Sequence, residues 1–140
     1  MKLFLPASIY EGMISHCIAG LPNEACGFLG GRDGVAERLY PMTNAAASPV
    51  IYRPDGREMV EAMNDMDSND LEPVGIFHSH VASAPYPSST DIHHAHYPDA
   101  VFIIVSLADR AHPLAKGYLI RKEDWRASTG EVEEVELVIS

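Results

Sequence analysis

An unbroken apolar run, AVFIIVSL at Ala100–Leu107, sets the strongest limit on the fold of this chain. A run this short, rich in β-branched and aromatic residues, is typical of a strand that is buried on both faces. Such a strand lies inside a sheet and needs a covering layer on each side. We therefore expect a central β-sheet with other elements packed against it.

Strands and helices alternate around this segment. Apolar residues at helical spacing predict helices over Ala7–Gly20, with Ser8 as a candidate cap, and over Pro54–Asp67, with Asp55 near its start; Ser88 predicts the start of a short third helix, Ser88–Tyr97. Six further strands are expected at Lys2–Leu5, Ala25–Leu29, Val35–Pro41, Val74–His78, Leu114–Arg121 and Glu131–Ile139, with the turn between the second and third of these at Gly30–Gly34. No internal repeat or linker interrupts them, so one α/β or α+β domain over residues 1–140 is expected.

Composition limits the partners of this domain. Hydrophobic residues make up 46% of the chain, which is enough for a core, and the formal net charge is -10. An acidic surface repels phosphate backbones, so nucleic acid is not an expected partner. The charge favours a partner with a basic face, although solubility alone also explains it.

Cysteine use and hydropathy indicate the compartment. Cys17 and Cys26 form no CxxC pair and no disulfide framework, which is typical of a reducing environment. Pro6 and Glu11 interrupt the short N-terminal apolar stretch, which does not resemble a signal peptide. No apolar run approaches the ~20 residues that span a membrane. We expect a cytoplasmic protein without membrane contact; a homodimer is compatible with these features.

Histidines gather in one part of the chain. Five of the seven lie between His78 and His96, beginning with His78-Ser79-His80 directly after an apolar segment. Side chains two residues apart on a strand point to the same face, so both imidazoles can reach one metal ion. A loop and a helical turn can return Asp91 to the same point. Two histidines and one carboxylate leave a ligand position open for water, the pattern of a catalytic zinc site.

Each piece also has a simpler interpretation. Histidine pairs occur by chance on surfaces, and Ser88 and Asp91 are also the cap and first-turn residues of an ordinary helix. Asp91 serves both purposes only if its carboxylate turns toward the metal, which the sequence leaves open.

The complete spacing is more specific than its parts. His78-Ser79-His80, seven residues, Ser88, two residues and Asp91 resembles the motif H-[ST]-H-x7-S-x2-D of the JAMM, or MPN-plus, metallopeptidase family. The upstream segment from Glu24 to Gly30 (EACGFLG) resembles that family's E-x-C-G-x-L-x-G. The resemblance covers nearly the whole chain and implies a single MPN-like domain, with a mostly antiparallel, curved central sheet flanked by two or three helices.

The resemblance also implies roles for single residues. His78, His80 and Asp91 would hold one Zn²⁺ per chain, Glu24 would be the general base, and Ser88 would hydrogen-bond the oxyanion or the attacking water. Ser79 receives no direct role. Cys26 is interpreted as a small packed residue. His93, His94 and His96 lie outside the motif, as a surface cluster that collects adventitious metal or, for His94, as a residue that supports a ligand.

The resemblance implies a substrate class as well. Small prokaryotic members cleave after the C-terminal Gly-Gly of a ubiquitin-like or sulfur-carrier protein, and we expect such a peptidase or isopeptidase here. Two alternatives within the fold stay open, a non-catalytic MPN scaffold and a cell-wall peptide hydrolase. A non-haem iron oxygenase and a zinc deaminase fit less well, because their usual His-x-Asp/Glu and His-x-Glu…Pro-Cys-x-x-Cys patterns are absent.

Overall fold

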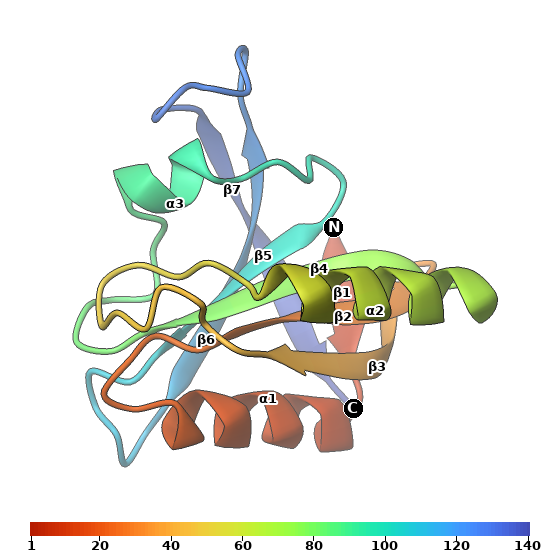
Figure 1. The fold of residues 1–140 in the computed structure, drawn as a ribbon, viewed down its shortest axis with the longest axis horizontal. Coiled ribbons are helices and arrows are strands. Elements are labelled where there is room, and N and C mark those ends of the chain that lie inside the picture. The colour runs from red at the N-terminus through yellow and green to blue at the C-terminus, as the bar shows by residue number, and fades with distance from the viewer.

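A computed structural model describes residues 1–140 (Figure 1) as a single small domain of seven strands and three helices. The strands are β1 (Lys2–Leu5), β2 (Cys26–Arg32), β3 (Val35–Met42), β4 (Glu72–His80), β5 (Val101–Ser106), β6 (Leu114–Arg121) and β7 (Glu131–Ile139). The helices are α1 (Ala7–Ala19), α2 (Gly56–Ser68) and α3 (Ser89–His93). None of the helices is long and apolar enough to span a membrane.

The sheet curves until it closes on itself. Its strand order is β1-β3-β2-β4-β5-β6-β7, and β7 pairs with β1. The β2–β3, β2–β4, β5–β6 and β6–β7 pairs are antiparallel, whereas β4–β5, β1–β7 and β1–β3 are parallel. The predicted class, a mostly antiparallel curved sheet with flanking helices, is confirmed; the closure into a barrel was not predicted.

Two apolar clusters lie on opposite faces of the sheet. Met13 and Cys17 of α1 pack in the first cluster, and Ala62 and Met66 of α2 pack in the second. Figure 1 shows α1 and α2 separated by strands of the sheet. Along β4, Ile76 belongs to the second cluster and Phe77 to the first, as strand alternation requires. Even-numbered residues at the end of β4 therefore share the face that α2 covers.

The hairpin turn lies within the predicted Gly30–Gly34 segment but is shorter than predicted. Gly30 and Gly31 do not form the turn; they stay in β2 and pair with both β3 and β4, beside a register shift. The chain reverses instead at Asp33-Gly34, where φ is 54° and 73°. Asp-Gly accepts positive φ at both central positions of a two-residue hairpin, so this dipeptide determines the turn.

The helix ends also differ from the predictions. The residue before α1 is Pro6, and Ser8, the predicted cap, already lies inside the first turn of this helix. The residue before α2 is Asp55, whose side chain makes no capping hydrogen bond. The third helix ends at His93 and not at Tyr97. Pro98 disfavours helical backbone at Tyr97, the predicted last residue of this helix.

Candidate metal centre and active site

His78 and His80 lie at the C-terminal end of β4, on the face covered by α2. The backbone of β4 is paired on both sides, with His78 opposite Cys26 of β2 and Ile104 of β5. The two histidines are 1% and 5% exposed. The sheet thus holds both imidazoles in fixed positions at its rim.

Asp91 reaches the histidines from the first turn of α3. Ser88 is the N-cap of this helix, and its Oγ accepts a hydrogen bond of 3.1 Å from the Asp91 amide. In return, Asp91 Oδ2 accepts a 2.9 Å hydrogen bond from the Ser88 amide. This reciprocal capping box orients the Asp91 carboxylate toward β4.

The three predicted ligands converge. One ligand atom from each of His78, His80 and Asp91 lies within 4.8 Å of the others. His80 Nε2 is 2.9 Å from Asp91 Oδ2, and His78 Nε2 is 3.2 Å from Asp91 Oδ1. The latter contact lacks hydrogen-bond alignment, so both buried ring nitrogens of His78 have no hydrogen-bond partner. Buried polar atoms are seldom left in this state, and nitrogen and carboxylate donors so placed suit a zinc ion.

The electrostatics of His78 and Asp91 favour their metal-binding forms, whereas at His80 burial lowers the pKa but the hydrogen bonds with Asp91 and Ala84 outweigh it and raise the pKa. Burial lowers the pKa of His78, which keeps this imidazole neutral. Burial acts on Asp91 in the opposite sense, but the imidazoles of His78 and His80 outweigh it and hold the carboxyl pKa well below its usual range. A neutral imidazole and an ionised carboxylate are the forms that coordinate metals.

The buried Glu24 carboxylate interacts electrostatically with Asp91 and His80. The side chain is 5% exposed, and its Oε1 has no hydrogen-bond partner. Burial, and then repulsion from Asp91, raises its pKa to about 7, against the lowering effect of His80. A carboxyl group that titrates near neutral pH can both take and return a proton.

The backbone around Glu24 is fixed by residues to which the motif gave no role. The Glu24 amide donates to Ser48 O at 2.9 Å, and its carbonyl accepts from Asn44 Nδ2 at 2.9 Å. The next amide, of Ala25, donates to the buried Ser79 Oγ at 2.8 Å. Ser79 therefore links the Glu24 segment to the strand that carries both histidines. The hydroxyl residue between the two histidines was the only sequence signal for this role.

Ser88 is exposed, and its oxygen serves as the helix cap described above. Its hydroxyl hydrogen is free to donate, since the cap bond uses only a lone pair. The structure thus places Ser88 beside Asp91, and its contact with an oxyanion or water stays a prediction.

The remaining candidates stay outside the group of ligands. Cys26 is fully buried in the second apolar cluster, and burial raises the pKa of its thiol to about 12. His93 Nδ1 donates a hydrogen bond to Arg126 O, His94 is exposed with its ring edge-on to His93, and the ring of His96 lies edge-on to Trp125. No three of these side chains converge as a metal site.

A cavity of about 580 Å³ adjoins the site on the α2 face. Its apolar lining includes Phe28, Ile76 and Phe102 from the sheet, and Ile51 and Tyr52 from the loop before α2. The Tyr52 ring stacks on His78, with centroids 4.4 Å apart, and so forms the wall between cavity and ligands.

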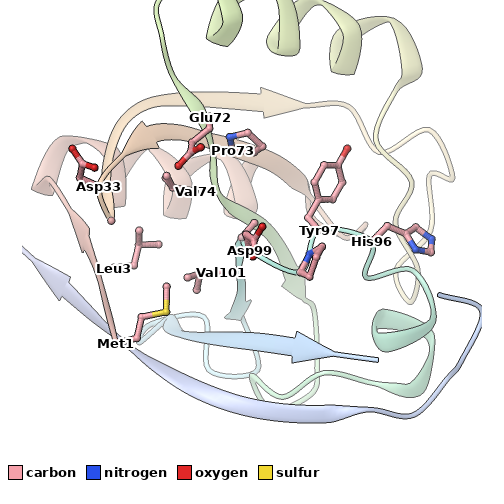
Figure 2. A pocket seen from close by; sticks show the side chains of 13 residues that line it. Met1, Leu3, Asp33, Glu72, Pro73, Val74, His96, Tyr97, Asp99 and Val101 are labelled. Atoms are coloured by element: carbon pink, nitrogen blue, oxygen red, sulfur yellow. The ribbon is translucent and has the colours of Figure 1, made fainter. Parts of the chain in front are cut away.

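A second cavity, of about 540 Å³, lies far from this chemistry. Figure 2 shows it lined by Leu3, Val74 and Val101 with the carboxylates of Asp33, Glu72 and Asp99 around them. It is at the end of β4 opposite to His78 and His80. No predicted catalytic or ligand residue lines either cavity, and both include His96 and Tyr97, but only the first is lined by Tyr52, which stacks on His78.

Known proteins resemble this chain over most of its length. The family model of prokaryotic homologs of the JAB domain matches residues 6–126. The CysO-cysteine peptidase of Mycobacterium bovis is 40% identical over 120 residues, covering 84% of this chain and 82% of that protein. The desampylase of Haloferax volcanii is 36% identical over 113 residues, covering 75% and 81%. The solution structure of a Desulfitobacterium hafniense protein superposes with a TM-score of 0.86 at 38% identity, covering 99% of this chain and 93% of that one.

Proposed function

This chain belongs to the family of prokaryotic homologs of the JAB domain, the small prokaryotic branch of the JAMM/MPN fold, and from this membership we propose that it is a zinc-dependent peptidase. The proposed substrate is a ubiquitin-like or sulfur-carrier protein, cut after its C-terminal Gly-Gly. The proposed ligands are His78, His80 and Asp91, the proposed general base is Glu24, and Ser88 is the proposed hydrogen-bond donor.

The observation that carries this proposal is the set of unpaired polar atoms at the end of β4. Both ring nitrogens of His78 and Oε1 of Glu24 are buried without hydrogen bonds, beside the paired Asp91 and His80. An unsatisfied buried group costs about 1–3 kcal/mol. A fold that keeps several such groups together is explained if a cation and a water molecule satisfy them in the working enzyme.

The residues divide the chemical work among them. A bound zinc ion would supply a Lewis acid that makes water nucleophilic near neutral pH. The Glu24 carboxylate accepts the proton of that water and returns it to the leaving amine. Ser88 donates its hydroxyl hydrogen to the carbonyl oxygen as negative charge develops there. The stacked ring of Tyr52 helps to keep His78 in place.

Relatives support the substrate class. The names of two of them, CysO-cysteine peptidase and desampylase, both describe removal of a group from a small modifier or carrier protein. The apolar cavity beside Tyr52 offers a surface for the residues that precede a Gly-Gly tail.

The test uses a carrier protein that ends in Gly-Gly and is extended by one cysteine. Zinc-loaded wild type should release that cysteine, detected by mass spectrometry. Glu24→Gln should keep the metal and lose activity by about 10²–10⁴-fold, the usual contribution of a general base. Glu61→Gln, which changes an exposed carboxylate on α2, is the control and should retain activity.

Other outcomes select the alternatives. Near-wild-type cleavage by zinc-loaded Glu24→Gln would contradict the role of Glu24. If the protein cuts a peptidoglycan-type peptide but no Gly-Gly carrier, it is a cell-wall peptide hydrolase and the proposed substrate class is wrong. A protein that binds no zinc and cuts neither would be a scaffold.

A further inference from the structure

The loop Val81–Pro87 connects His80 to the helix that carries Asp91. Hydrogen bonds fix this loop to the sheet on both sides of the Ala84 carbonyl group. We propose that Tyr118 and Ser106 are positioning residues that keep His80 in its ligand orientation through the carbonyl oxygen of Ala84. This inference rests on the proposed zinc site and identifies residues of β5 and β6 that its motif does not contain.

The first step is the tautomer of His80. Its Nδ1 lies 2.9 Å from Ala84 O. A carbonyl oxygen only accepts hydrogen bonds, so Nδ1 carries the hydrogen and donates it. In the neutral ring that coordinates a metal, the lone pair is then on Nε2, the atom that lies 2.9 Å from Asp91 Oδ2. Metal-binding histidines generally need such a partner on the other nitrogen, and its loss weakens metal binding.

The second step is the position of Ala84. This residue is exposed, lies outside any helix or strand, and has no buried side chain to fix it. Its carbonyl oxygen also accepts the Tyr86 amide at 2.8 Å, which makes a tight local turn. The orientation of this turn must be determined by the residues on either side of Ala84.

The third step is the pair of anchors. Ser106 Oγ donates to Ser83 O at 2.7 Å, and the Tyr118 hydroxyl donates to Pro85 O. Ser106 and Tyr118 are 6% and 3% exposed. The β5–β6 ladder, which includes the pair Phe102 and Tyr118, holds both donors rigidly. The carbonyls before and after Ala84 are thus both fixed to the sheet.

These contacts form a continuous connection from the sheet to the metal ligand. Two side-chain hydroxyls hold the flanking carbonyls, the turn presents Ala84 O, and Ala84 O holds His80 Nδ1–H. The His80 carbonyl oxygen accepts a 2.9 Å hydrogen bond from the amide of Leu107, the residue directly after β5, so His80 and the loop are both tied to the C-terminal end of this strand. Removal of either hydroxyl should let the loop shift and His80 rotate.

The test compares two tyrosine-to-phenylalanine substitutions. Tyr118→Phe removes the hydroxyl that binds Pro85 O and keeps the ring. Tyr40→Phe is the matched control, because its hydroxyl makes a similarly close bond, 2.6 Å to Asp65 Oδ2, away from the ligands. Zinc affinity is measured by competition with a chelating dye, and the ligand geometry by the visible absorption spectrum of the Co²⁺-loaded protein.

We expect Tyr118→Phe to bind zinc about 10-fold more weakly than wild type and to change the Co²⁺ spectrum, the usual size of effect for a residue that supports a ligand. Tyr40→Phe should match wild type in both measurements, although both substitutions remove a structural hydrogen bond. Ser106→Ala should change zinc affinity in the same direction as Tyr118→Phe, and it provides the second test if Tyr118→Phe folds poorly.

The outcomes separate this inference from the proposed function. If wild type binds zinc and Tyr118→Phe and Ser106→Ala bind it as tightly as Tyr40→Phe does, the positioning role is wrong and the proposed function stands. If wild type itself binds no zinc at this site, the proposed function fails and the positioning role fails with it.

Discussion

The buried Glu24 carboxylate should make the metal-free protein less stable as pH rises. Its pKa is about 7 in the folded protein, where burial and Asp91 act on it, against a reference value of 4.5. At about 1.36 kcal/mol for each pKa unit, the difference corresponds to roughly 3 kcal/mol of unfolding free energy. Glu24→Gln removes this effect because an amide of similar shape does not ionise.

The sign follows from which state binds the proton. Below pH 4.5 both folded and unfolded chains hold it, and above pH 7 neither does, so the stability difference changes only between these values. Within this window the folded protein holds a proton that the unfolded chain has released. Rising pH therefore favours unfolding, and the stability present at low pH is lost by about pH 7.

The assay is urea unfolding of chelator-treated wild type and Glu24→Gln between pH 5 and pH 8. The free-energy advantage of Glu24→Gln over wild type should grow across this range by as much as ~3 kcal/mol. Glu11→Gln is the control, because this exposed side chain on α1 meets water in both states. A Glu24→Gln advantage that stays constant with pH would refute the reasoning. If the advantage of Glu24→Gln grows with pH as expected, the fold keeps an ionisable carboxylate that lowers its own stability, as active sites commonly do.

Three further predictions follow from neighbouring features. Ser79→Ala leaves the buried Ala25 amide without its acceptor and should lower the unfolding free energy by about 1–3 kcal/mol, measured in urea. Cys17 and Cys26 are buried and the pKa of each thiol is raised to about 12, so neither should react with a thiol reagent at pH 8 until urea unfolds the protein; rapid labelling of the folded protein would contradict this. Ile51→Glu, on the exposed rim of the apolar cavity, should raise KM for a Gly-Gly carrier several-fold with kcat little changed, and an unaltered KM would exclude this cavity from substrate binding.

Strands β5, β6 and β7 were predictable because burial on one or both faces leaves a local pattern in the sequence. The AVFIIVSL run became β5 with a difference of one residue at each end, and β6 and β7 have the expected bounds. The closure of the barrel left no such mark. Alternation in β7 indicates a half-buried strand but does not reveal that Leu3 of β1 lies opposite Leu137, since pairing partners far apart in sequence are not encoded by periodicity.

The residues that support the site were not predictable for a related reason. His78, His80 and Asp91 obey a spacing because a strand and a capped helical turn connect them directly. Asn44 and Tyr118 act through hydrogen bonds to backbone carbonyls, of Glu24 and Pro85, that lie far from them along the chain. Their side chains have no special spacing and no unusual chemistry, so only the fold reveals what they hold.

Asp91 illustrates how two competing interpretations of one residue can both describe it. From the sequence, Asp91 could serve as both a helix-cap residue and a metal ligand only if its carboxylate turned toward the metal. In the structure Oδ2 accepts the Ser88 amide and also lies 2.9 Å from His80 Nε2, while Oδ1 lies 3.2 Å from His78 Nε2. A carboxylate has two oxygens and about four acceptor sites, so it can cap a helix and still face two imidazoles. The cap thus fixes the orientation of the third proposed ligand, which explains why a serine three residues before Asp91 belongs to the same motif.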